Sequence, residues 1–273
     1  MKSNAELRRQ ARTYLRGNWG MVVLCTLLVG LASYMLMMPV AMGSAVATLA
    51  SGVQTMANSV ILNVWQILVW LAILPASWML TVMCLRIIRG EHEERHVRIG
   101  EVLEGYRYTN RVIFTNVLLA AIMMALVVIY VMAMVLVVEG LESLPLANSE
   151  VVKTVILAFL IVIFLALIIF VALRLSLAEF LIWDTDLGAF GILRESNRMM
   201  KGRCWKMLGL SLSFIGWALL AVLTLFVGFL WLQPYINASV AAFYDNIREE
   251  EAEAAAQQAA ADVELIENNE TLV

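Results

Sequence analysis

The sequence predicts an all-α protein, a polytopic membrane helical bundle of about six transmembrane helices arranged as three hairpins, with amphipathic helices at the cytoplasmic interface. Hydrophobic residues make up 62% of the 273 residues and charged residues 15%, against roughly 45–50% and about 25% in soluble globular chains. No Asp, Glu, Lys, Arg or His occurs in the 69 residues from 17 to 85. A water-soluble fold of this size would lack the polar residues to cover its surface.

Apolar runs long enough to cross a bilayer, about 20 residues each, define the spans. The last run, Met207–Tyr244, holds 38 uncharged residues and would be roughly 57 Å long as one helix. Because the hydrocarbon core is only about 30 Å thick, two short spans joined by a tight turn near Thr224–Gly228 fit better. The predicted spans lie near 19–42, 60–85, 112–138, 154–174, 206–223 and 228–246, between a basic interfacial segment, 1–18, and an acidic Ala/Glu-rich tail, 248–273.

The distribution of basic residues predicts that both termini are cytoplasmic. With six spans, 18 of the 19 Lys and Arg residues fall on one side and Lys153 alone on the other, as the positive-inside rule requires. A five-span count leaves 17 inside and moves the acidic tail outside, so both counts stay open. A cleavable signal peptide is the alternative for the N-terminus, but the run Met21–Met42 exceeds the 7–15 residues of an h-region.

The N-terminal segment predicts an amphipathic helix lying on an anionic leaflet. Ser3 or Asn4 can cap it, and Leu7, Ala11, Tyr14 and Leu15 share one face. Each Arg near such a leaflet adds about 1 kcal/mol of attraction; a solvated basic arm is the alternative. A second interfacial helix is predicted after Asp184, with Phe190, Leu193, Asn197 and Met200 at helical spacing. The candidate lipid or partner contacts on the two helices are Arg8, Arg9, Arg12, Arg16, Arg198 and Lys201.

The segment His92-Glu93-Glu94-Arg95-His96 has the spacing of a zinc site, because His residues at i and i+4 share a helix face. Its charged surroundings lack the dry cavity and fixed supporting contacts that activate a metal-bound water. We therefore expect no metal and no cofactor, with His92 and His96 only weak metal candidates. A solvated charged loop is the expected structure.

Arg174 and Glu179 are the only ionisable residues inside an apolar run, which makes them a candidate intramembrane polar site. On one continuous helix they would point about 140° apart and meet separate partners. Their place at the cytoplasmic end of the fourth span favours snorkelling to the interface. A structural role and a transport site are the two alternatives.

Four segments resemble one bacterial family. They are AELRRQARTYLRGNWG at 5–20, Arg89-Gly90-Glu91, SNRMMKGRCWKMLGLSLSFIGWALL at 196–220 and PYINASVAAFY at 234–244. They are similar to the membrane family catalogued as "domain of unknown function 975", over roughly residues 3–247. The resemblance implies a six-helix, multi-pass protein of the bacterial inner (cytoplasmic) membrane, and it implies no reaction, substrate or active-site residue.

Two functions remain open. The first is a non-enzymatic membrane scaffold or accessory protein that meets anionic lipids of the inner leaflet, a protein partner or a second copy. The second is a small-molecule or lipid transporter with a cavity between repeated hairpins, suggested by apolar spans that start at Trp19, Val112 and Trp205, 93 residues apart. No phosphate-binding loop, nucleophile–base pair or nucleic-acid surface occurs in the sequence, so we expect no enzyme and no nucleic-acid partner.

Overall fold

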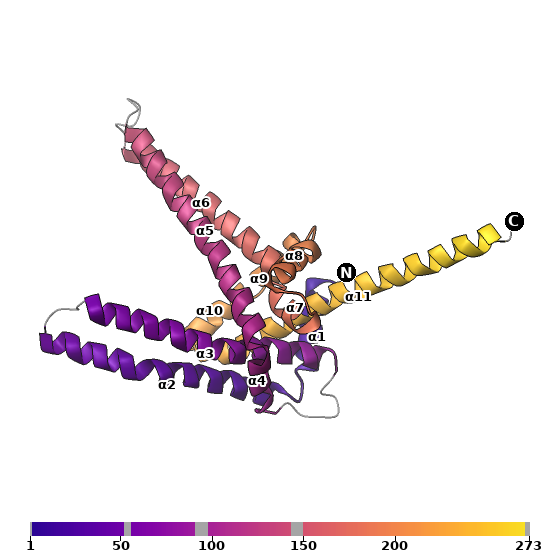
Figure 1. Ribbon diagram of the computed structural model, residues 1–273, viewed down its shortest axis with the longest axis horizontal. Helices are drawn as coiled ribbons and strands as arrows, with labels where there is room; N and C mark the ends of the chain where they lie inside the picture. The colour runs from indigo at the N-terminus through magenta and orange to yellow at the C-terminus, as the bar shows by residue number, and fades with distance from the viewer. Residues whose placement is uncertain (1, 52–55, 91–97, 143–149, 271–273) are drawn as a thin grey trace. The chain divides into compact units, whose positions relative to one another are not determined.

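A computed structural model describes residues 2–51, 56–90, 98–142 and 150–270 (Figure 1), and the described chain is helical with no strand. The prediction of an all-α fold is confirmed. The elements are α1 (Asn4–Tyr14), α2 (Trp19–Ser51), α3 (Met56–Ile88), α4 (Glu101–Glu104), the 3-10 turn η1 (Gly105–Tyr108), α5 (Thr109–Glu142), α6 (Glu150–Leu175), α7 (Ala178–Asp184), α8 (Ala189–Met199), α9 (Cys204–Leu212), α10 (Ile215–Leu223) and α11 (Phe229–Glu270).

Five helical segments in the described chain are long and apolar enough to cross a membrane. They are Trp19–Val46, Ser59–Ile88, Glu101–Gly140, Val151–Asp184 and Cys204–Leu223. The residues predicted as a sixth span form the first part of α11, which is not among the five. The count of six therefore stays a prediction.

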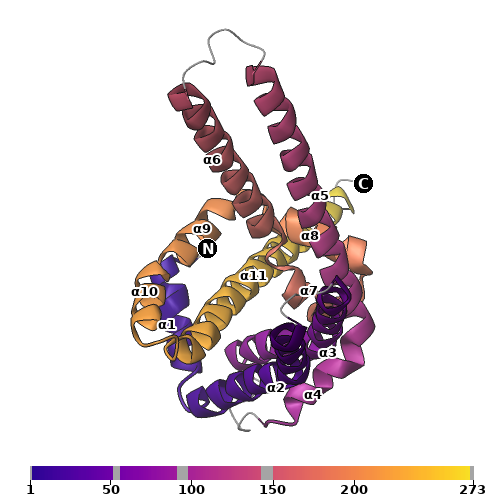
Figure 2. The same cartoon turned by 90° about the vertical axis from the view of Figure 1, so that its left-hand side faces the viewer.

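The chain divides into two compact units, residues 1–108 with 209–273 and residues 109–208. In the first unit α2 and α3 lie side by side (Figures 1 and 2), and Trp65 Nε1 of α3 donates a 2.8 Å hydrogen bond to the Leu36 carbonyl of α2. Burial is concentrated near one end of this pair. It includes Val22 and Cys25 on α2 and most of Trp78–Ile88 on α3, whereas Leu31 and Val60 are exposed.

Ion pairs and hydrogen bonds hold α1, α3, α4 and α11 together at that end. Arg86 Nη1 lies 3.3 Å from Glu101 Oε2, and Arg89 Nε lies 2.8 Å from Asp245 Oδ1. The Lys2 backbone N–H donates to Asn246 Oδ1 at 3.0 Å, and its ammonium lies 3.1 Å from Glu249 Oε2. Residue 2 and residues 245–249 therefore lie at the same end of this unit.

Gly105→Ala is expected to destabilise the packing of η1 on α3. A Cβ at Gly105 would overlap the Pro75 carbonyl oxygen and lie 3.0 Å from Met79 Cβ, and overpacking of this kind costs about 1–3 kcal/mol. Thermal unfolding in detergent measures the loss. Gly100→Ala is the matched control, because nothing lies within 4 Å of its added Cβ; equal shifts in the two variants would refute this packing.

The second unit is a long helical hairpin with two short helices at one end. Tyr130 of α5 stacks on Phe164 of α6, with ring centroids 3.8 Å apart. Arg111 donates hydrogen bonds to the carbonyls of Thr185 and Leu187 and thereby ties α5 to the segment between α7 and α8. Most of α5 and α6 exposes apolar side chains, which is the surface that a bilayer would cover.

Candidate functional site

The helix α1 begins at a capping box, as the Ser3 side chain suggested. The Glu6 N–H donates to Ser3 Oγ at 3.3 Å, and the Ser3 N–H donates to Glu6 Oε2 at 2.6 Å. The apolar face of α1 does not lie in a leaflet, because Leu7, Ala11 and Leu15 are buried and α1 packs on α3 and α11. The predicted contact of this face with lipid is therefore wrong, except at the exposed Tyr14.

The arginines of α1 remain at the surface. Three arginines are exposed: Arg9 and Arg12 on α1, and Arg16 two residues after its end. They are here called the α1 basic face, and no residue in the described part of the chain forms an ion pair with them. Arg8 is half-buried, and its Nε has no hydrogen-bond partner among the described residues. Burial of the apolar face thus leaves three uncompensated positive charges facing outward.

Like α1, the helix α8 buries apolar side chains within the protein. Leu193 and Met200, which belong to the predicted interfacial helix, are buried, while Phe190 is 79% exposed. Arg198 is exposed but makes two hydrogen bonds to Glu195, at 2.6 and 2.8 Å, so much of its charge is compensated. Lys201 is exposed beyond the end of the helix.

Arg174 and Glu179 do not share a helix, because α6 ends at Leu175 and α7 begins at Ala178. The predicted 140° separation on one continuous helix is therefore wrong. Arg174 Nη1 donates to Asn197 Oδ1 of α8 at 2.7 Å, and its guanidinium carbon lies 5.1 Å from the centre of the Phe170 ring. Glu179 is exposed beside a small cavity of about 130 Å³. Arg174 thus links α6 to α8.

The two histidines of the weak zinc candidate, His92 and His96, lie outside the described residues. Within the described ranges, no group of three or more His, Cys, Asp or Glu side chains could hold a metal ion. The expectation that His92 and His96 bind no metal stays a prediction.

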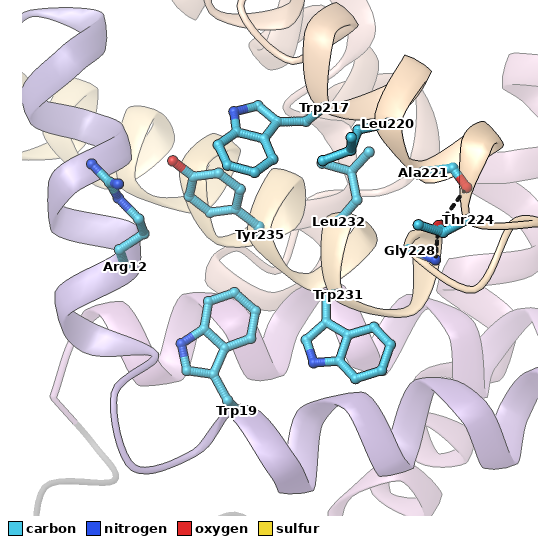
Figure 3. Close-up of a pocket in the computed structure, with 10 residues that line it drawn as sticks. All are labelled: Arg12, Trp19, Trp217, Leu220, Ala221, Thr224, Gly228, Trp231, Leu232 and Tyr235. Carbon is cyan, nitrogen blue, oxygen red and sulfur yellow. Dashed lines mark hydrogen bonds between the residues drawn. The ribbon is translucent and has the colours of Figure 1, made fainter.

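The first unit contains a cavity of about 320 Å³ between α1, the start of α2, α10 and α11 (Figure 3). Aromatic and aliphatic side chains form its walls, and Arg12 is the one charged residue among the described residues that line it. In Figure 3, Arg12 lies at one end of the row of side chains, and Thr224 and Gly228 lie at the other. The lining residues are Arg12, Trp19, Trp217, Leu220, Ala221, Thr224, Gly228, Trp231, Leu232 and Tyr235.

The far end of the cavity is the turn between α10 and α11, at the position that the sequence predicted. Leu225 and Phe226 adopt positive φ values of 52° and 68°. Thr224 Oγ1 donates to the Ala221 carbonyl at 2.8 Å and accepts the Gly228 N–H at 3.0 Å, as the dashed lines in Figure 3 show. A threonine side chain thus closes the hairpin.

Sequence reasoning missed the aromatic walls of this cavity. Trp19 and Trp217 lie within the segments that carry the family resemblance, and tryptophans near the ends of apolar runs are typical of a membrane interface. The position of these tryptophans in the sequence could have identified each of them as a candidate interfacial residue. It could not have shown that Trp19 and Trp231, more than 200 positions apart, line one cavity.

Comparison with known proteins identifies a family. A family model described as "Protein of unknown function (DUF975)" matches residues 1–251, which leaves out most of the acidic tail. No curated protein and no solved structure matches the chain. The matching description names no reaction.

Proposed function

The chain belongs to the family described as protein of unknown function DUF975, and we propose that it is a non-enzymatic integral membrane protein, a scaffold or accessory protein. In this proposal the α1 basic face binds anionic lipid headgroups of the cytoplasmic leaflet. The observation that carries the proposal is the exposure of Arg9, Arg12 and Arg16 beside the membrane-span-like helix α2. Guanidinium groups pair with phosphate in a fixed fork geometry.

The contacts of Lys2 support the proposed topology, with both termini cytoplasmic in the bacterial inner membrane. Because Lys2 is hydrogen-bonded to Asn246 and Glu249, these residues lie on one side of the bilayer. The chain between them must then cross an even number of times. Six spans satisfy this condition, and so do four spans followed by a hairpin that returns to its own side. The excess of Lys and Arg on that side supports a cytoplasmic location for it.

A transporter is the second candidate. A cavity of about 320 Å³ between α2 and α3 favours it, because Ser33, Gln66 and Ser77 line that cavity among apolar side chains. Polar groups at membrane depth mark many substrate paths, but they also serve as hydrogen bonds between helices. The α1 basic face gives the lipid-binding proposal the stronger support.

The triple variant Arg9→Gln, Arg12→Gln, Arg16→Gln is expected to lose anionic lipid. Each basic side chain near an anionic surface contributes about 1 kcal/mol. Removal of three therefore lowers the affinity for phosphatidylglycerol, relative to that for phosphatidylcholine, by up to about a hundredfold. The measurement is native mass spectrometry of the full chain, purified with equal phosphatidylglycerol and phosphatidylcholine, with the ratio of retained lipids as readout.

Arg198→Gln is the control, because Glu195 already compensates Arg198. It should retain phosphatidylglycerol as the wild type does. If the triple variant keeps the wild-type lipid ratio, the proposal is wrong. If it keeps that ratio but loses a co-purifying acidic protein, the basic face serves a protein partner instead.

A further inference from the structure

We infer that the cavity between α1, α2, α10 and α11 holds one anionic phospholipid of the cytoplasmic leaflet. Its phosphate lies at Arg12, and one acyl chain runs between α10 and α11 toward the turn at Thr224–Gly228. The inference rests on the proposed function and deepens it, because it replaces general attraction to a charged leaflet with a single defined site.

From the aromatic level at Tyr235 to its turn, the hairpin is no deeper than about one leaflet. Tyr235 packs against Trp19, the first residue of α2, with ring centroids 6.5 Å apart, and against Phe214 at 5.2 Å. From this aromatic level, α10 continues to Leu223 and α11 begins at Phe229. At 1.5 Å per residue these arms are about 14 and 9 Å long. Half of the hydrocarbon core is about 15 Å, so a hairpin whose aromatic level lies at the interface reaches no deeper than about the bilayer midplane.

The turn has the backbone hydrogen bonding and the apolar side chains that the hydrocarbon core of a bilayer requires. The N–H groups from Thr224 to Leu232 all donate hydrogen bonds within the hairpin, Gly228 to Thr224 Oγ1 and the others to carbonyls. Non-helical backbone at membrane depth needs its polar groups to be hydrogen-bonded within the protein, because the hydrocarbon core holds no water. The exposed side chains of the turn are apolar, with Leu225 85% and Phe226 66% exposed, whereas turns in water favour Gly, Pro, Asn, Asp and Ser.

The cavity has the charge and shape of an anionic amphiphile. Arg12 lies at the interfacial end, with no ion-pair partner among the described residues. The walls toward the turn are apolar, and Trp217 and Trp231 are each about half exposed. A volume of about 320 Å³ lies within the usual range for small-molecule sites. It accommodates a phosphate and the first part of a chain, while the remainder lies in the leaflet.

Quenching of tryptophan fluorescence tests this site. The full chain is reconstituted into vesicles of nine parts phosphatidylcholine and one part phosphatidylglycerol, with brominated acyl chains on one lipid at a time at equal mole fraction. We expect brominated phosphatidylglycerol to quench more strongly. Arg12→Gln should weaken this preference about tenfold, since it removes a charge-assisted contact. The double variant Trp217→Phe, Trp231→Phe should remove most of the excess quenching.

Arg198→Gln is the control, because Arg198 is an exposed arginine that does not line the cavity and is already compensated by Glu195. It should keep most of the preference. If Arg12→Gln lowers the preference no more than Arg198→Gln does, the cavity inference is overturned while the proposed function stands. If the wild type is quenched equally by both lipids, both are overturned.

Discussion

Gly228→Ala is expected to force α10 and α11 apart and to cost about 2–4 kcal/mol of stability. The added Cβ would lie 2.8 Å from both Ala221 Cα and Thr224 Oγ1 and 3.0 Å from Ala221 Cβ. Backbone atoms cannot rotate away, so the helices must separate and the Thr224–Gly228 hydrogen bond must lengthen. Thermal unfolding in detergent, followed by tryptophan emission, measures the loss through the nearby Trp217 and Trp231.

Gly216→Ala on α10 is the control for Gly228→Ala. Nothing lies within 4 Å of its added Cβ, and alanine is favoured over glycine in a helix by about 1 kcal/mol. This variant should be as stable as the wild type or slightly more stable. Similar losses in both variants would mean that α10 and α11 do not approach at Gly228.

Asp245→Arg should destabilise the attachment of α11 to the end of α3 by about 2–4 kcal/mol, because it removes the carboxylate paired with Arg89 at 2.8 Å and places a like charge beside it. The two side chains are only 26% and 18% exposed, so water screens them incompletely. The charge-swapped double variant Arg89→Asp, Asp245→Arg should recover most of the loss. A double-mutant cycle on thermal stability isolates the coupling between the two sites.

The pair formed by Lys2 and Glu249 is the control for this cycle. Its side chains are 40% and 52% exposed, and pairs of that kind contribute only about 0–1 kcal/mol. Glu249→Lys should therefore shift the melting temperature far less than Asp245→Arg. A swapped variant no more stable than Asp245→Arg would contradict the Arg89–Asp245 contact.

The helices and the last turn could be predicted because they depend on local properties of the chain. The absence of charge from residue 17 to 85 predicts buried or membrane-embedded helices whatever their neighbours are. The turn at Thr224–Gly228 was predictable because 38 uncharged residues are too long for one span. The break between α6 and α7 at Ser176–Leu177 was missed, since neither residue is a strong helix breaker.

The partner of each amphipathic face could not be predicted, because an apolar stripe meets protein and lipid equally well. Leu7 and Ala11 on α1 contact protein rather than a leaflet, and so do Leu193 and Met199 on α8. On α1, Arg9 and Arg12 are exposed, whereas Arg8 is half-buried. The aromatic cavity depends on the pairing of α1 and α2 with α10 and α11, which no local pattern encodes.

The most direct test of the account is the lipid selectivity of the intact protein in a bilayer. Electron paramagnetic resonance of spin-labelled phosphatidylglycerol and phosphatidylcholine, each added to the reconstituted full chain, measures how much of each lipid the protein immobilises. We expect the protein to immobilise phosphatidylglycerol preferentially at low ionic strength. The preference should shrink in about 1 M salt, where the screening length is about 3 Å. Equal immobilisation of the two lipids at low salt would contradict the binding of anionic lipid by the α1 basic face.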